Sequence, residues 1–134
     1  MARSFKSDYS FGKKNEVNIL SRINNYFKDD IKEVQKQTEV FDFEGNLNIY
    51  ELKSRTNTYK AYNTTLLGYN KIIKANKGQV FIFSFTDGLY YIKYEEEIFK
   101  TFEKKMFVRN QRNDYNDTEK LYIFIPIDKL TKIL

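Results

Sequence analysis

Three charged side chains in the first half of the chain have the types and spacing that suit phosphodiester chemistry: Asp42, Glu51 and Lys53. Side chains alternate between the two faces of a strand, so Glu51 and Lys53 are expected on one face, roughly 6 to 7 Å apart. A tight turn before this strand places Asp42 opposite Glu51, with Cβ atoms about 5 Å apart. Two carboxylates and a lysine are therefore expected to converge.

A cation is expected where two carboxylates lie this close, because their repulsion otherwise raises the pKa of one of them. The chain contains no histidine and no cysteine, so only oxygen ligands are expected, and such a set selects Mg²⁺, for which Mn²⁺ substitutes. A neighbouring lysine orients or deprotonates the attacking water, or neutralises charge that develops at phosphorus. The pattern predicts phosphodiester hydrolysis.

The composition of the chain excludes several classes of catalytic and metal site. Without histidine or cysteine, Ser-His-Asp and Cys-His nucleophilic sites, thiolate or imidazole zinc sites and haem ligation are excluded. The 134 residues fit a single domain over 1–134, in which residues 1–10 are expected to form a flexible arm. No apolar run approaches the ~18 residues that span a bilayer, so we expect no membrane association and an intracellular location, cytoplasmic or nuclear, which includes a viral or phage protein in its host cell.

The elements that position these side chains follow from apolar spacing and turn residues. Apolar periodicity predicts helices, and alternation bounded by Gly-Asn or Asp-Gly predicts hairpins. The expected order is a helix from Ser10–Lys13 to Phe27, strands 40–44 and 47–55, a helix over 57–77, strands 79–85 and 89–94, a helix over 95–106, a polar loop over 109–120 and a buried strand over 121–127, after which residues 128–134 add a last turn. This order predicts an α/β domain with a mixed central sheet of about five strands flanked by helices.

The spacing Asp42, eight residues, then Glu51-Leu52-Lys53, behind a helix that carries Glu16, resembles the PD-(D/E)XK nuclease superfamily. The resemblance implies a restriction-endonuclease-like αβββαβ core. It also implies that Asp42 and Glu51 bind the metal, that the Leu52 carbonyl completes the ligand shell, that Lys53 acts at the attacking water and that Glu16 is the acid of the first helix. Phe41 stands where the family motif has proline.

The size of the chain, Gly12-Lys13-Lys14 ahead of Glu16 and the Glu-Leu-Lys-Ser-Arg strand look similar to the archaeal and viral Holliday-junction resolvase branch, and also to small restriction-type nucleases. The net charge of +5 suits a polyanion, and DNA is preferred over RNA. Symmetric cuts in a duplex or junction call for a homodimer. The residues expected to contact nucleic acid are Lys13, Lys14, Arg55, Lys60, Lys71, Arg109 and Arg112.

Other interpretations of the same residues stay open. Asp42, Glu51 and Lys53 also fit a solvated hairpin face with a cross-strand ion pair worth ~0.2 to 1 kcal/mol. Glu16 also fits a capping or snorkelling residue. A strand register shifted by one or two residues would bring in other acids, namely Asp30, Glu39 and Glu44. The alternative functions are a basic module that binds nucleic acid or protein without cutting it, and an RNA endonuclease.

Overall fold

The computed structural model describes residues 18–33, 43–69, 72, 78–107 and 120–133. Residues 18–27 form a helix. The later elements are β1 (Lys32–Glu33), β2 (Phe43–Glu44), β3 (Ile49–Ser54), β4 (Thr64–Gly68), β5 (Gln79–Phe85), β6 (Gly88–Lys93), α3 (Glu96–Phe99), β7 (Glu103–Phe107), β8 (Lys120–Pro126), the 3₁₀ turn η1 (Ile127–Lys129) and β9 (Thr131–Lys132). The fold is α/β, and strands dominate it.

In the described part of the chain, the larger sheet, sheet A, has six strands in the order β1-β2-β3-β5-β6-β9. The first three strands form an antiparallel meander, β5 runs parallel to β3, and β6 returns antiparallel to β5. The β2–β3 pairs are Phe43 with Tyr50 and Glu44 with Ile49. This is the register that the prediction of Asp42 opposite Glu51 requires, although Asp42 lies outside the described residues.

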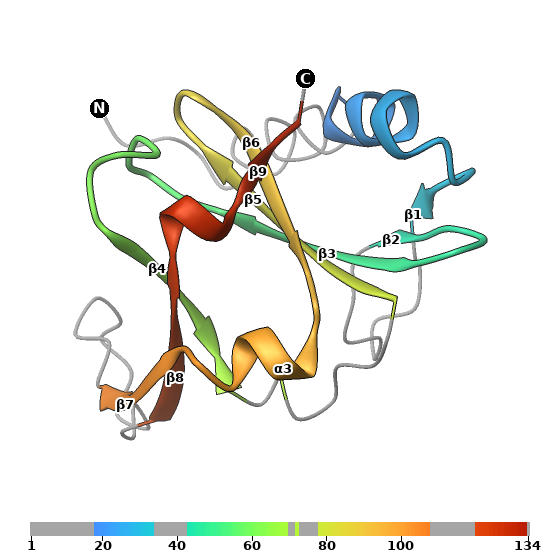
Figure 1. Cartoon of the computed structure of the whole chain (residues 1–134). Helices are drawn as coiled ribbons and strands as arrows, with labels where there is room; N and C mark the ends of the chain where they lie inside the picture. The colour runs from blue at the N-terminus through green and yellow to red at the C-terminus, as the bar shows by residue number, and fades with distance from the viewer. Residues whose placement is uncertain (1–17, 34–42, 70–71, 73–77, 108–119, 134) are drawn as a thin grey trace, which may run out of the picture.

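The smaller sheet, sheet B, has three antiparallel strands in the order β4-β8-β7. The chain leaves β8 through η1 and adds β9 to the edge of sheet A beside β6 (Figure 1). α3 stands between β6 of sheet A and β7 of sheet B. The C-terminal segment therefore ties the two sheets together, because one continuous run of chain pairs with both.

Apolar side chains cover both faces of sheet A. On one face, Tyr50, Val80 and Ile82 pack with Ile19 and Ile23 of the helix over 18–27. On the other face, the core is formed with sheet B, α3 and the segments that flank them, and its buried members are Leu67, Ile72, Phe81, Phe83, Phe85, Ile92, Phe99, Phe102, Ile123, Ile125 and Leu130. A side chain on β3 therefore meets the helix or sheet B according to whether its number is even or odd.

The structure corrects several expected elements. The predicted helix over 57–77 is wrong across β4, where Thr65 and Leu67 alternate with half-buried neighbours, although Tyr69 and Ile72 are helical. The helix expected over 95–106 is limited to α3, and its second half is strand β7. The prediction of one sheet with about five strands is likewise wrong, because the described residues form one sheet of six strands and a second sheet of three. A sheet, rather than helices alone, covers one face of sheet A.

Both hairpins and the strand after the polar loop are confirmed. β5 and β6 pair through the Thr86-Asp87 turn, and β8 occupies most of the predicted range 121–127. The expected arm over 1–10, the start of the first helix and residues 109–119 of the loop expected over 109–120 lie outside the described residues, while Lys120 begins β8. Within the described part of the chain, no helix is long and apolar enough to cross a membrane.

Candidate functional site

β3 carries the two charged residues of the predicted motif that the structure describes. In the parallel register with β5, Glu51 lies beside Phe81 and Lys53 beside Phe83. Both phenylalanines belong to the core on the sheet B face, so Glu51 and Lys53 project from that same face. The predicted alternation is thereby confirmed.

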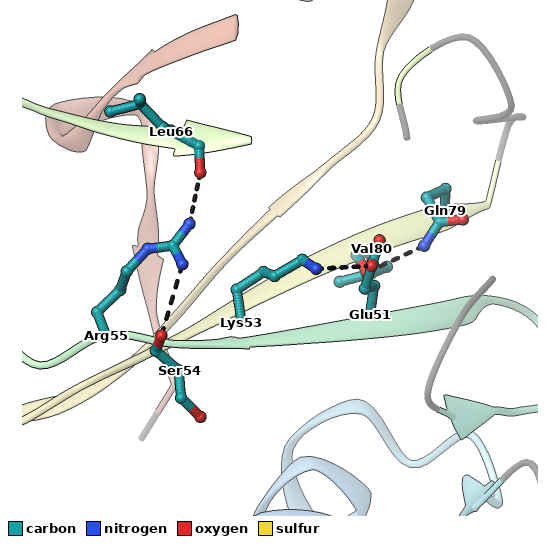
Figure 2. Close-up of polar contacts among 7 residues, drawn as sticks. All are labelled: Glu51, Lys53, Ser54, Arg55, Leu66, Gln79 and Val80. Atoms are coloured by element: carbon teal, nitrogen blue, oxygen red, sulfur yellow. Dashed lines mark hydrogen bonds and ion pairs between the residues drawn. The ribbon is translucent and has the colours of Figure 1, made fainter. Parts of the chain in front are cut away.

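Glu51 and Lys53 form an ion pair inside this face. Lys53 Nζ lies 3.1 Å from Glu51 Oε1, and the glutamate side chain is 5% exposed whereas the lysine side chain is 31% exposed (Figure 2). Burial penalises an isolated carboxylate strongly, and a neighbouring ammonium offsets that penalty. The interpretation of a solvated hairpin face is therefore wrong for Glu51.

Gln79, the first residue of β5, is buried on the same face. It lies beside Ile49 in the register, two residues before the Glu51–Phe81 pair, and it is 6% exposed. Glu51 therefore stands between Lys53 on its own strand and Gln79 on the next one, as Figure 2 shows. The amide nitrogen of Gln79 is 3.4 Å from the carbonyl oxygen of Val80, which is a long hydrogen bond.

Arg55 follows directly after β3 and links it to sheet B. Its Nη2 donates to the carbonyl of Leu66, as Figure 2 shows. Its Nε donates to Thr65 Oγ1 at 3.1 Å, and its guanidinium carbon lies 5.4 Å from the Phe83 ring centroid. The side chain is half-buried. These contacts give Arg55 a structural role, and its predicted contact with nucleic acid stays a prediction.

A second buried carboxylate fixes the turn that leads into β3. Asp29 Oδ1 accepts a hydrogen bond from the amide of Leu47 at 2.6 Å, and its Oδ2 accepts from the amide of Asn48 at 2.9 Å and from Tyr50 Oη at 2.8 Å. The backbone oxygen of Asp29 accepts from the amide of Asn46 at 2.9 Å. The turn is thus held by one residue, Asp29, through its side chain and its backbone oxygen, and this fixes where β3 begins.

The pKa shifts at Asp29 and Tyr50 and the close packing at Gly45 both favour the hydrogen bonding of Asp29 to the turn. Burial acts to raise the pKa of Asp29, but the hydrogen bonds from Tyr50 and the turn amides outweigh burial, so the pKa lies below its ordinary value. Burial and the hydrogen bond to Asp29 raise the pKa of the Tyr50 hydroxyl. Gly45 is required in the turn, since a Cβ there would lie 2.2 Å from Asp29 Oδ2.

The other predicted site residues are placed as follows. Leu52 is half-buried on the helix face of β3, and Lys60 is exposed in a turn between β3 and β4 rather than on a helix. Outside the described residues lie Lys13, Lys14, Glu16, Asp42, Lys71, Arg109 and Arg112. The structure thus brings Glu51 and Lys53 together and leaves the predicted partners Asp42 and Glu16 untested.

Sequence reasoning missed Gln79 and Asp29. Gln79 stood in the sequence as the polar first residue of an otherwise apolar run, Val-Phe-Ile-Phe, and that contrast was a usable signal. Asp29 gave no comparable signal, because its partners are 17 to 21 residues away and act mainly through backbone amides.

Glu51 can contribute one ligand to a divalent cation that prefers oxygen. The buried Glu51 carboxylate is a hard oxygen donor of the kind that Mg²⁺ and Mn²⁺ accept. Among residues 18–33, 43–69, 72, 78–107 and 120–133, no three Asp or Glu side chains gather as a ready-made metal site. A complete carboxylate set would therefore draw on an acid outside those ranges, such as Asp42.

Comparison with known proteins gives no match: no family model fits the chain, and neither curated proteins nor solved structures include one similar to it.

Proposed function

We propose that the chain is a metal-dependent endonuclease that hydrolyses phosphodiester bonds of DNA, organised as in the PD-(D/E)XK superfamily. The observation that carries the proposal is the buried Glu51 carboxylate beside Lys53 Nζ, 3.1 Å away, on one face of a central strand. A carboxylate that can hold a cation and an amine that can act at the attacking water are two of the groups that the chemistry needs.

The order of elements in sheet A supports the same proposal. The helix over 18–27 precedes the meander β1–β2–β3, residues 69 and 72 are helical, and β5 then runs parallel to β3. This order fits an αβββαβ core in which β3 is the strand that carries the Glu-x-Lys motif. In this proposal β4 is an addition between β3 and the second helix, and it belongs to sheet B.

The chain's own residues have distinct roles in this account. Glu51 holds the cation together with Asp42, and the Leu52 carbonyl is assigned to the same shell by the resemblance. Lys53, whose ammonium is balanced by Glu51 and partly open to solvent, donates hydrogen bonds to the attacking water or to a phosphate oxygen. Glu16 is assigned as the acid of the first helix. Bound Mg²⁺ supplies Lewis-acid polarisation of the phosphate.

Basic residues account for substrate binding, and a homodimer accounts for paired cuts. Lysine and arginine neutralise phosphates without reading sequence, so binding is expected to weaken steeply with salt. Lys60, which is exposed, is a direct candidate for such a contact. A two-fold pair of chains would present two sites to the two strands of a duplex or a four-way junction.

The direct test is cleavage of labelled duplex, single-stranded and four-way-junction DNA and of RNA, each with Mg²⁺, Mn²⁺ or EDTA. The native protein is compared with Lys53→Ala and with Lys60→Ala, an exposed lysine outside the pair. We expect metal-dependent cutting of DNA that falls by about 100- to 10,000-fold in Lys53→Ala, and cleavage by Lys60→Ala that is restored when the salt concentration is lowered.

The same experiment separates the alternatives. Cutting confined to RNA would make the protein an RNA endonuclease with the same site. Tight, salt-sensitive binding without cleavage of any substrate would overturn the nuclease and favour a non-catalytic binding module, in which the Glu51–Lys53 pair serves only to balance a buried charge.

A further inference from the structure

The loop between β3 and β4, residues 55–63, carries two tyrosines whose surroundings are opposite. The Tyr59 ring stacks on the Tyr90 ring with their centroids 3.9 Å apart and meets Phe85 edge-on. Tyr62 is 65% exposed, and in the described part of the chain its ring contacts no other ring and its hydroxyl makes no hydrogen bond. One tyrosine therefore anchors the loop, and the other presents its ring to solvent.

The loop that carries Tyr62 is held in place at both ends. Near its start, the amide of Tyr59 donates to Asp87 Oδ1 in the β5–β6 turn at 2.9 Å. At its end, the amide of Ile127 in η1 donates to the carbonyl of Asn63 at 3.0 Å, and Tyr59 Oη donates to the carbonyl of Ile127 at 2.7 Å. The loop, the turn and η1 lie at the same end of the molecule (Figure 1). A ring on a loop that is already ordered loses little conformational freedom on binding a ligand.

A lysine accompanies the exposed ring. Lys60 lies two residues before Tyr62 in the same loop and is also exposed. A nucleotide offers a flat base with a negatively charged phosphate beside it, and the loop offers an aromatic ring with an ammonium beside it. Proteins bind single strands with this combination, in which bases stack on aromatic side chains and basic residues neutralise the backbone. The loop therefore fits a nucleotide.

The ring also selects a class of nucleic acid. Inside a continuous duplex each base face is covered by its stacked neighbours, whereas unpaired nucleotides leave a face open to an aromatic side chain. The loop follows directly after β3, the strand that carries Glu51 and Lys53. A base held at Tyr62 would thus be bound by the segment that continues from the Glu51–Lys53 pair.

We propose that Tyr62 stacks on an unpaired base, and that the substrate is a nucleic acid with single-stranded nucleotides rather than a continuous duplex. This inference rests on the proposed function and names its substrate class. Lys60 contributes the phosphate contact and Tyr62 contributes the base contact, so the two side chains are expected to act on different parts of the same strand.

The test is binding of a fluorescently labelled single-stranded DNA oligonucleotide, measured by anisotropy in EDTA so that no cleavage occurs. A blunt duplex of the same sequence and an abasic strand of the same length are the comparison ligands, because the first covers its base faces and the second keeps only the sugar-phosphate backbone. The native chain is compared with Tyr62→Ala, which removes the ring, and with Tyr62→Phe, which keeps it. Leu47→Ala is the matched control, because Leu47 is 76% exposed in the turn at the other end of β3. Thermal unfolding checks the fold of each variant.

We expect the native chain to bind the single strand more tightly than the abasic strand or the duplex. Tyr62→Ala should weaken binding of the single strand about 5- to 150-fold and leave binding of the abasic strand unchanged. Tyr62→Phe and Leu47→Ala should bind as the native chain does. Lys60→Ala should weaken binding of both strands and reduce the slope of log affinity against log salt concentration by about 0.7, whereas Tyr62→Ala should keep the native slope.

Native affinity for the single strand in a folded Tyr62→Ala overturns the proposal, as does a loss in Tyr62→Phe equal to that in Tyr62→Ala. If Tyr62→Ala fails to fold, Tyr62→Leu replaces it, because leucine keeps apolar bulk without an aromatic face, and native affinity in Tyr62→Leu then overturns the proposal. A native chain that binds the duplex as tightly as the single strand overturns the substrate class. A chain that binds the single strand through Tyr62 but cuts no nucleic acid overturns the proposed function and leaves the assignment of Tyr62 intact.

Discussion

Asp29 and Glu51 are both buried carboxylates beside β3, but their surroundings differ in kind. Asp29 accepts three hydrogen bonds at its two side-chain oxygens, from two turn amides and Tyr50 Oη, all between 2.6 and 2.9 Å. Glu51 instead pairs with the long side chain of Lys53, which is 31% exposed. A carboxylate bound by backbone amides fixes a turn, whereas one paired with a partly exposed lysine suits contact with a charged ligand.

The largest effect on stability that this comparison predicts is at Asp29. Asp29→Asn keeps the shape of the side chain but places an NH₂ group against donors, so we expect the free energy of unfolding to fall by about 1 to 3 kcal/mol. Asp30→Asn is the matched control, because Asp30 is exposed and its ion pair with Lys32 spans 3.6 Å, and it should change stability by less than about 0.5 kcal/mol. Denaturant unfolding measures both. Equal losses of unfolding free energy in Asp29→Asn and Asp30→Asn would show that the buried hydrogen bonds of Asp29 stabilise the fold no more than an exposed carboxylate does.

The Asp29 contribution should also depend on pH. Its pKa is lower in the folded chain than the ordinary value of 3.8, so the unfolded chain binds the extra proton. The contribution is therefore complete above about pH 4 and is lost as the pH falls through the folded pKa. The difference in unfolding free energy between the native chain and Asp29→Asn should shrink on acidification. A difference that stays constant with pH would show that the carboxylate charge is not involved.

A smaller effect is expected where the two sheets are joined by Arg55. Arg55→Lys loses the guanidinium group that donates to Thr65 and Leu66 and contacts the Phe83 ring. The free energy of unfolding should therefore fall by about 1 kcal/mol. Lys60→Ala, at an exposed position, is the comparison for a residue that only contacts DNA, and it should leave stability unchanged. If Arg55→Lys leaves stability unchanged but weakens DNA binding as Lys60→Ala does, Arg55 acts on the substrate rather than between the sheets.

The smallest effect concerns Tyr91, whose hydroxyl lies 3.5 Å from that of Tyr26. Burial, with a further contribution from Tyr26, raises the pKa of Tyr91 to about 12 from an ordinary value of 10.0. The unfolded chain loses this proton first, so stability falls between those two pH values. Tyr91→Phe should make that alkaline loss shallower, with a change below about 1 kcal/mol at neutral pH. If Tyr91→Phe loses stability with rising pH as steeply as the native chain does, Tyr91 does not contribute to the alkaline loss.

The sequence predicted the parts of the fold that rest on local patterns. Both hairpins follow from turn residues between alternating strands, and the Glu51–Lys53 face follows from that alternation. β4 was missed because Leu66 and Tyr69 coincide with helical spacing, whereas the buried leucine is Leu67, set by pairing with β8 more than 50 residues away. Tyr62, which a helix over 57–77 would place on the same face as Leu66 and Tyr69, is 65% exposed.

The candidate site likewise has one part that local patterns predict and one part that they do not. Glu51 and Lys53 could be predicted because they are neighbours on one strand. Gln79 approaches them only through the parallel pairing of β3 with β5, which no short-range pattern encodes. Long-range pairing likewise decides that sheet B, rather than a helix, covers the face from which these residues project.

The measurement that tests the central claim most directly is Mn²⁺ binding by the native chain, Glu51→Gln and Asp29→Asn, with each shown to be folded. The account predicts that Glu51→Gln loses Mn²⁺ affinity by more than about 10-fold, because a ligand carboxylate has become an amide, whereas folded Asp29→Asn binds Mn²⁺ as the native chain does. Equal Mn²⁺ binding by the native chain and Glu51→Gln would contradict the claim, and Glu51 would then be a structural carboxylate like Asp29.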